Sequence, residues 1–251
     1  MVHIVGAGCG AADLITLRGK RLIEEADVIV YAGSLVNPEL LRYAKPGCEL
    51  HDSAKMTLEE TTAVIRAAEE AGRTTVRLHS GDPSLYGAIE EQIREFHRLG
   101  IDYDITPGVS AFSGAATALG IEYTQPGVSQ SVIVTRAAGR TPVPEGEELR
   151  SFAAHRAPMV LFLSTGLLDR VTEELTAGGY PADTPAAIVY KASWPDEKIC
   201  RCTVGTLEET AKANSISKTA LIIVGRVLED NGTRSLLYDP AFPTGFREKS
   251  V

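Results

Sequence analysis

The chain has 251 residues, of which 44% are hydrophobic and 23% are charged. This length fits one large domain or two small ones. There are 33 acidic and 25 basic residues, and the formal charge of -8 argues against binding nucleic acid through bulk electrostatics. Residues 1–125 carry 18 acidic and 11 basic residues and the rest carries 15 and 14, so the acidic excess lies in the first half.

The four cysteines and five histidines form no known metal-binding or disulfide pattern. Cys200 and Cys202 are two residues apart, so on a strand both thiols would face one side. We therefore expect no metal ion, reduced thiols and a cytoplasmic location. No apolar run approaches the roughly 18 residues of a membrane span, and the N-terminus is typical of a strand that enters a glycine loop, so we expect no signal peptide and no membrane association.

Short β-branched runs alternate with helical patterns along the first half. Strands are expected at residues 2–5, 28–31, 74–78 and 103–106. Helices are expected at 16–26 with Thr16 as N-cap, at 37–44 with Asn37 as N-cap, at 57–72 from a capping box, at 87–98 and after Ser110. This alternation predicts a largely parallel sheet covered by helices, an α/β fold.

Residues 121–130 have no clear period and contain a Pro-Gly pair, so we place a domain boundary there. The expected division is an N-terminal α/β domain over 1–120, a C-terminal α/β domain over 121–228 and an irregular tail over 229–251. In the second domain, strands are expected at 131–135, 159–164, 186–190, 199–204 and 219–224, with helices at 147–155, at 167–177 and from Thr206. Residues 136–146 hold two prolines and two glycines and predict a long ordered loop of the kind that carries function.

Three glycine-containing turns follow strands of the first half. Residues 6–11 (GAGCGA) fit the dinucleotide fingerprint G-x-G-x-x-G/A, but the helix starts too late to meet a pyrophosphate and the second strand ends in Tyr31, not in an acid. Residues 80–87 (SGDPSLYG) and 107–111 (PGVSA) follow later strands. A single turn of this kind most often only ends a strand, but three such turns along one edge of a parallel sheet favour a small-molecule site.

Two segments of the second half place cations beside small residues after predicted strands. They are residues 135–140 (TRAAGR) and 190–198 (YKASWPDEK). Cations at strand ends are usually solvated, and Trp194 before a proline can simply pack. The functional hypothesis is a cationic wall in which Arg136, Arg140 and Lys191 bind the carboxylates of a ligand.

Together the motifs at 6–10, 80–87 and 107–110 resemble the tetrapyrrole methylases, which use S-adenosylmethionine to methylate uroporphyrinogen-derived macrocycles. Residues 31–36 (YAGSLV), 135–144 and 190–198 narrow the resemblance to the branch that methylates precorrin-4, with or without cobalt, at carbon 11 in cobalamin biosynthesis. The resemblance covers about residues 1–228. It implies two α/β domains with a cleft between them, a homodimer, and S-adenosylmethionine as cofactor, with S-adenosylhomocysteine as the product.

Carried over by position, the resemblance assigns cofactor contacts to Cys9, Gly81, Asp82, Leu85, Ser110, Ala111, Ser164, Thr165, Ala192, Ala220 and Leu221. The family often has proline where this chain has Cys9, and Asp-Pro where it has Ala11 and Ala12. Methyl transfer from a sulfonium to an electron-rich ring is an in-line displacement, so alignment in a water-poor site can supply much of the catalysis. No residue is identified as a general base, and Tyr31, Ser34 and Tyr86 are candidates for contacting the ring.

Three other interpretations stay open. The first is another methyltransferase of the same fold, acting on uroporphyrinogen, another precorrin, RNA ribose or a modified histidine; the acidic charge argues against RNA. The second is a nicotinamide-dependent oxidoreductase based on residues 6–11, which is weak because that fingerprint lacks its structural context. The third is an effector-binding protein without catalysis.

Overall fold

The computed structural model describes residues 1–229 and 232–248 and forms two compact units. Unit 1 consists of Met1–Ala115 and Lys191–Glu197, and unit 2 of Ala116–Tyr190 and Lys198–Val251. The sequence-based division at residue 120 did not include the segment Lys191–Glu197 in the first domain. In the structure this segment, although it comes from the second half of the chain, belongs to unit 1. Of the tail expected over 229–251, residues 230–231 and 249–251 lie outside the described part.

Unit 1 is built on a five-stranded sheet in the order β3-β2-β4-β1-β5, and every pair of neighbours is parallel. The strands are β1 (Val2–Gly6), β2 (Val28–Tyr31), β3 (Glu49–Asp52), β4 (Thr75–His79) and β5 (Tyr103–Thr106). The prediction of a parallel sheet is therefore confirmed for this unit. β3 was not predicted, because its four residues lie at the sheet edge and show no alternation of buried and exposed side chains.

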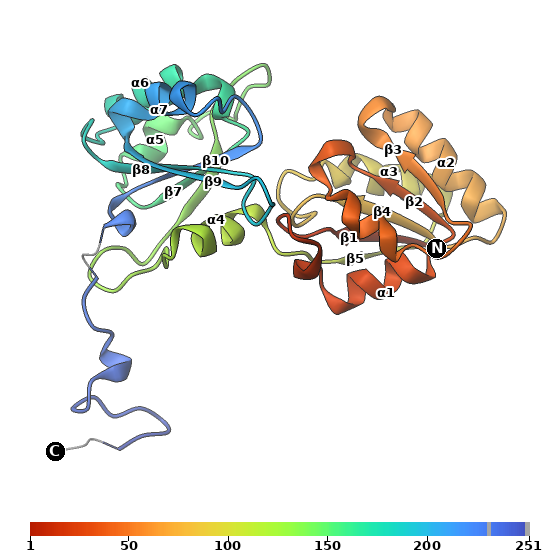
Figure 1. Cartoon of the computed structure of the whole chain (residues 1–251), viewed down its shortest axis with the longest axis horizontal. Helices are drawn as coiled ribbons and strands as arrows, with labels where there is room; N and C mark the ends of the chain where they lie inside the picture. The colour runs from red at the N-terminus through yellow and green to blue at the C-terminus, as the bar shows by residue number, and fades with distance from the viewer. Residues whose placement is uncertain (230–231, 249–251) are drawn as a thin grey trace. The chain divides into compact units, whose positions relative to one another are not determined.

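Helices cover both faces of the unit 1 sheet (Figure 1). On one side lies α1 (Leu17–Glu25), and on the other lie α2 (Leu58–Glu70) and α3 (Ile89–Leu99). Thr16 caps α1, and Thr57 and Glu60 form the predicted capping box of α2. Residues 37–44 were expected as a helix and form the 3₁₀-helix Pro38–Tyr43 instead. The helix α4 (Ala111–Leu119) begins in unit 1 and ends in unit 2.

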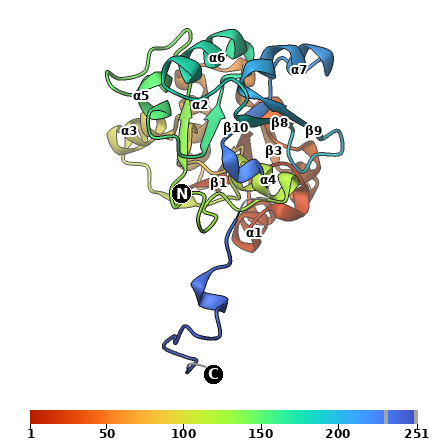
Figure 2. The ribbon, with the colours of Figure 1, turned by 90° about the vertical axis from the view of Figure 1, so that its left-hand side faces the viewer.

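Unit 2 contains a five-stranded mixed sheet in the order β6-β7-β10-β8-β9. The strands are β6 (Ile133–Arg136), β7 (Met159–Phe162), β8 (Pro185–Tyr190), β9 (Lys198–Thr203) and β10 (Ala220–Val224). β6 and β7 are parallel, whereas β10 runs antiparallel to β7 and β8. The helices α5 (Leu149–Ala153), α6 (Leu168–Ala177) and α7 (Leu207–Ala213) lie along one face of the sheet in both ribbon views (Figures 1 and 2).

In each sheet, the turns and strand ends identified from the sequence as candidate ligand-binding segments lie at one edge. In unit 1 the carboxyl ends of the parallel strands bring residues 31–36, 80–87, 6–11 and 107–111 to the same edge. In unit 2 the register pairs Arg136 with Phe162 and Ala220 with Tyr190, so the ends of β6, β7 and β8 meet the start of β10. Among the described residues, no helix combines the length and apolarity that a bilayer crossing requires.

Candidate functional site

The three glycine turns of unit 1 are in direct backbone contact. Gly8 and Gly81 exchange two hydrogen bonds, with the Gly8 N–H donating to the Gly81 carbonyl at 3.2 Å and the Gly81 N–H donating to the Gly8 carbonyl at 2.9 Å. A Cβ atom on Gly108 would lie 2.2 Å from the Gly81 carbonyl oxygen, and one on Gly6 would lie 2.6 Å from the Gly108 nitrogen. No side chain fits between these turns, so their backbones form one continuous surface at the edge of the sheet.

Asp82 ties two of these turns together. One carboxylate oxygen accepts the Gly108 N–H at 2.9 Å, and the other accepts the Ser84 N–H at 2.9 Å and the Ser84 hydroxyl. Partial burial disfavours the charged form, but the hydrogen bonds from Ser84 and Gly108 outweigh it and lower the pKa of Asp82. The carboxylate therefore serves the geometry of the site by holding residues 80–87 against residues 107–111.

The segment Lys191–Glu197, called the strap below, is seated on the first glycine turn. The Ala11 N–H donates to the Ser193 hydroxyl at 3.0 Å, and that hydroxyl lies 3.4 Å from the Cys9 sulfur. A Cβ on Gly10 would lie 2.3 Å from Cδ1 of Trp194. Gly10 is thus required by the strap, a role that the fingerprint interpretation of residues 6–11 did not anticipate.

Internal contacts fix the strap in a strained conformation. Lys191 and Ser193 have φ angles of 48° and 65°, in the left-handed region that non-glycine residues rarely adopt. The Ser193 N–H donates to the Glu197 carboxylate at 2.6 Å. The Lys191 ammonium pairs with Asp196 at 2.6 Å and lies 5.2 Å from the ring centroid of Trp194. The ammonium that we predicted to orient substrate carboxylates thus already has a carboxylate partner within the strap.

Asn37 is a buried contributor to the site that sequence reasoning identified only as a helix cap. Its side-chain oxygen accepts the Glu39 N–H at 3.0 Å, which is the predicted cap. Its amide nitrogen also donates to the Gly10 carbonyl at 2.9 Å. The available signal was the residue type, because an asparagine cap keeps two amide N–H donors for a second partner, whereas an aspartate cap has none.

The predicted cofactor residues of unit 1 lie along this edge. Gly81 approaches the start of α4, where its Cβ would be 3.6 Å from the Ala111 nitrogen and 3.8 Å from Cα of Ser110. The Leu85 N–H bonds to the Asp82 carbonyl at 3.2 Å. Cys9 and Ala192 are buried at the seat of the strap. The structure thus brings together Cys9, Gly81, Asp82, Leu85, Ser110, Ala111 and Ala192.

The three candidates for contacting a ring occupy the same edge of unit 1. Tyr31 ends β2 and is half-buried, and Ser34 follows it and is exposed. Tyr86 comes after β4, is 44% exposed and has a φ angle of 56°. Tyr86 therefore combines an exposed aromatic ring with backbone strain, a pairing that often marks functional loops.

In unit 2 the predicted cofactor residues engage the backbone of their own sheet. The Ser164 hydroxyl donates to the Phe162 carbonyl at 2.7 Å and accepts the Ala137 N–H at 2.8 Å. The Thr165 hydroxyl donates to the carbonyl of Ala220 at 3.0 Å. These bonds tie the ends of β6 and β7 to the start of β10. Leu221 follows Ala220 in β10, and both are buried.

Of the three cations predicted to bind ligand carboxylates, Arg136 and Lys191 already have partners within the protein, whereas Arg140 does not among the described residues. The Arg136 guanidinium donates to the carbonyls of Thr141 at 3.1 Å and Pro142 at 2.6 Å, so it organises its own loop. Arg140, in that loop, is exposed, and within the part of the chain that the structure describes it has no hydrogen bond or ion pair. Arg140 is thus the member of the wall whose donors are available to a ligand.

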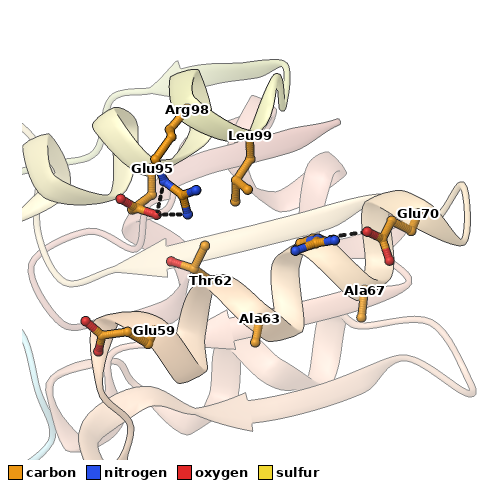
Figure 3. A pocket seen from close by; sticks show the side chains of 9 residues that line it. Glu59, Thr62, Ala63, Ala67, Glu70, Glu95, Arg98 and Leu99 are labelled. Carbon is orange, nitrogen blue, oxygen red and sulfur yellow. Dashed lines mark hydrogen bonds and ion pairs between the residues drawn. The ribbon is translucent and has the colours of Figure 1, made fainter.

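A groove of about 380 Å³ lies elsewhere in unit 1, between α2 and α3 (Figure 3). Its charged side chains pair with each other, Arg66 with Glu70 at 2.8 Å and Arg98 with Glu95 at 2.7 Å. It lies on the helical face of the unit and includes none of the strand-end turns. No group of three or more metal-ligating side chains occurs within residues 1–229 and 232–248.

The glycine turns on the strand-end edge of unit 1 are the motifs that resemble a family of methyltransferases, and a comparison with known families supports that resemblance. The chain belongs to the tetrapyrrole (corrin/porphyrin) methylases, whose family signature matches residues 1–208.

Within that family, the chain is similar over nearly its whole length to enzymes named for precorrin-4 or for its cobalt-containing form. It is 52% identical to the cobalt-precorrin-4 C(11)-methyltransferase of Methanocaldococcus jannaschii over 98% of this chain and 96% of that protein. It is 49% identical to the precorrin-4 C(11)-methyltransferase of a Sinorhizobium species over 98% of each chain.

Solved structures support the fold assignment. A cobalt precorrin-4 methyltransferase of cobalamin biosynthesis superposes with a TM-score of 0.89 at 46% identity, covering 91% of this chain and 95% of that one. The uroporphyrin-III C-methyltransferase of Thermus thermophilus, solved in complex with S-adenosyl homocysteine, gives a TM-score of 0.75 at 29% identity and covers 90% and 98%. The predicted tetrapyrrole methylase fold is therefore confirmed.

Proposed function

We propose that this protein transfers a methyl group from S-adenosylmethionine to carbon 11 of a precorrin-4 macrocycle, forming the precorrin-5 skeleton in cobalamin biosynthesis. The observation that carries this proposal is the similarity, over nearly the whole chain, to two relatives with that reaction in their names. One relative is named for the cobalt-containing substrate and the other for the metal-free one. We therefore propose the shared tetrapyrrole as the substrate.

The unit 1 edge suits a cofactor that is held largely by backbone groups. The glycines of these turns carry no side chains that would cover their backbone groups, so a ligand can approach the main chain closely. When bound, S-adenosylmethionine supplies an electrophilic methyl group on its sulfonium. We assign its binding to Cys9, Gly81, Asp82, Leu85, Ser110, Ala111 and Ala192, with Asp82 acting by fixing the two turns that it joins. The contacts of Ser164, Thr165, Ala220 and Leu221 remain predictions from the resemblance.

Catalysis by this chain would consist mainly of alignment. An in-line displacement requires the reacting atoms to be held at a fixed approach, and effective alignment is worth up to about 7–11 kcal/mol. Three sets of hydrogen bonds provide that rigidity: the two between Gly8 and Gly81, those that Asp82 accepts, and the one between the strap and Ala11. Tyr31, Ser34 and Tyr86 are proposed to contact the ring, and Arg140 to bind its carboxylates, with Arg136 holding the loop that carries Arg140.

The test is incubation with labelled S-adenosylmethionine and either cobalt-precorrin-4 or precorrin-4, followed by NMR location of the methyl group. Methylation at carbon 11 supports the proposal, and methylation elsewhere or none with either substrate refutes it. Calorimetric titration with S-adenosylhomocysteine and NADH separates the classes, because tight binding of NADH alone would exclude a methyltransferase. Arg140→Ala should raise KM for the macrocycle, whereas Arg66→Ala, in the groove between α2 and α3, should not.

We further propose a cytoplasmic homodimer that binds neither nucleic acid nor membranes. The dimer is implied by the family resemblance and is tested by sedimentation equilibrium. All four cysteines are free thiols in the structure, which suits a reducing compartment. The formal charge of -8 supports the absence of nucleic-acid binding, which a mobility-shift titration at low salt would check.

A further inference from the structure

Leu163 is an apolar side chain that the backbone turns out of the unit 2 core. In the strand β7, Met159 and Leu161 belong to the buried cluster beneath the helices. If the strand continued to Ser164, as the sequence predicts, Leu163 would share their face. The strand ends instead at Phe162, and Leu163 has a φ angle of 51° and is 69% exposed. The prediction of a strand to Ser164 was wrong at this point.

This conformation is held by specific bonds and is unfavourable by itself. A left-handed backbone is strained for leucine, and an exposed leucine gains nothing from burial. The Ser164 hydroxyl closes the turn around Leu163 by donating to the Phe162 carbonyl, and it also accepts the Ala137 N–H. Within residues 116–229, only Leu163 and Ile199 are large apolar residues that the structure leaves exposed. The turn therefore maintains a strained, solvent-facing leucine at the edge where the predicted ligand residues gather.

The neighbouring loop brings a cation to the same edge of the unit 2 sheet. The Ala137–Ser164 bond joins the loop after β6 to the turn after β7, and a Cβ on Gly139 would lie 3.0 Å from Cδ1 of Leu167. Arg140 directly follows Gly139 in that loop. An exposed apolar side chain and an available guanidinium at one sheet edge match a ligand with a flat apolar body and a rim of carboxylates.

We propose that Leu163 is a specificity-determining residue that packs against the apolar face of the tetrapyrrole substrate. The inference rests on the proposed function and extends it to a residue that neither the motifs nor the family resemblance assigned. The Ser164 hydroxyl is the group that keeps the Leu163 turn in place. Because the strain serves ligand contact, removing it should improve stability while it harms substrate binding.

The experiment measures steady-state methyl transfer and thermal unfolding for Leu163→Gly, Leu163→Asn and Leu163→Met. Glycine and asparagine tolerate the left-handed backbone and lack the apolar surface, so KM for the macrocycle should rise about tenfold in both. Methionine keeps the apolar contact and should hold KM within about twofold of the wild type. The Tm of Leu163→Gly should equal that of the wild type or exceed it by up to about 4 °C.

Arg156→Gly is the matched control. Arg156 is exposed, has a φ angle of 52° and precedes the opposite end of β7, so this change relieves similar strain away from the edge. It should leave KM for the macrocycle unchanged. The dissociation constant for S-adenosylhomocysteine should be unchanged in every variant, because Leu163 is assigned to the substrate.

Each remaining outcome separates the proposal from its rivals. An active wild type with an unchanged KM in Leu163→Gly overturns the role of Leu163 and leaves the proposed function intact. Weaker S-adenosylhomocysteine binding in Leu163→Gly would assign the side chain to the cofactor, and loss of the dimer in sedimentation would assign it to a second copy of the chain; both overturn the proposal. If the wild type methylates neither form of precorrin-4, the proposed function fails and the assignment fails with it.

Discussion

Gly108→Ala tests whether the contact between the glycine turns creates the cofactor site. The added Cβ would lie 2.2 Å from the Gly81 carbonyl oxygen and 2.8 Å from Cα of Gly6. Both neighbours are backbone atoms, so neither can rotate away. Since non-bonded heavy atoms are normally about 3.5 Å apart, one turn must retreat by about 1 Å. The same retreat would stretch the 2.9 Å bond from the Gly108 N–H to Asp82.

Two readouts are expected to change by different amounts. Overpacking of this kind costs about 1–3 kcal/mol, which corresponds to a Tm loss of about 2–12 °C for a chain of this size. A displacement of about 1 Å in a positioning element costs about 100-fold in rate, so kcat/KM for methyl transfer should fall by about that factor. At 25 °C the variant should remain folded by circular dichroism, which allows the loss of activity to be assigned to geometry.

Gly245→Ala, outside the predicted ligand segments, is the control for this prediction. Its Cβ would meet nothing within 4 Å, and its backbone is outside the left-handed region, so activity and Tm should stay close to those of the wild type. Calorimetry with S-adenosylhomocysteine should show weaker binding by Gly108→Ala alone. A Gly108→Ala enzyme with wild-type affinity and kcat/KM would show that the close contact between the turns is irrelevant to function.

Three further predictions concern the supports of the same edge. Ser193→Ala leaves the Ala11 N–H without its acceptor and should weaken S-adenosylhomocysteine binding about fivefold by calorimetry, whereas Ser151→Ala in unit 2 should not. The pKa of Asp82 is lowered in the folded protein, so its stabilisation is present above the unfolded pKa and is lost as pH falls through the folded one; the Tm difference between wild type and Asp82→Asn should therefore shrink between pH 6 and about pH 3, and a constant difference would refute this. Gln92→Leu removes the acceptor of the Nε–H of the buried Arg77, whose pKa burial lowers to about 10, and leaves, among the described residues, only the bond to the Val30 carbonyl; it should cost about 1–3 kcal/mol in urea unfolding, with exposed Gln130→Leu as the neutral control.

Local sequence signals predicted most of unit 1, although they missed the edge strand β3. Thr16 and Thr57 begin their helices where the capping pattern indicated, because capping depends on residues within one helical turn. The glycine turns follow their strands for the same local reason, and parallel pairing brings them to one edge. The interruption between residues 6–11 and the first helix is also real, since the 3₁₀-helix Ala12–Leu14 intervenes.

The strap and the Leu163 turn could not be predicted because their causes are not local. The strap joins unit 1 through contacts between residues 9–11 and 192–194, about 180 positions apart, and no pattern in either segment specifies its partner. At Leu163 the alternating side-chain directions of β7 favour burial. They are opposed by the Ser164 hydroxyl, which closes the turn onto the Phe162 carbonyl and is itself held by an N–H from the distant loop after β6. The sequence therefore predicted which turns lie at the sheet edges, but not the hydrogen bonds that join those turns to segments far away in the chain.

The second half of the chain carries less excess negative charge than the first, but few of its cations near the predicted ligand segments are available to bind an anion. Three of the four cations near the predicted ligand segments of the second half are already engaged: Arg136 by loop carbonyls, Lys191 by Asp196, and Lys198 by the Asn214 carbonyl. Carbonyl groups leave the guanidinium charge of Arg136 in place, so it can attract an anion over about 8 Å at physiological salt without binding it. At Lys191, by contrast, the Asp196 carboxylate cancels most of the attraction that the ammonium would exert on an anion. We therefore expect a carboxylate-rimmed ligand to be drawn toward the loop after β6, where Arg140 is proposed to bind it, at the same sheet edge as the exposed Leu163.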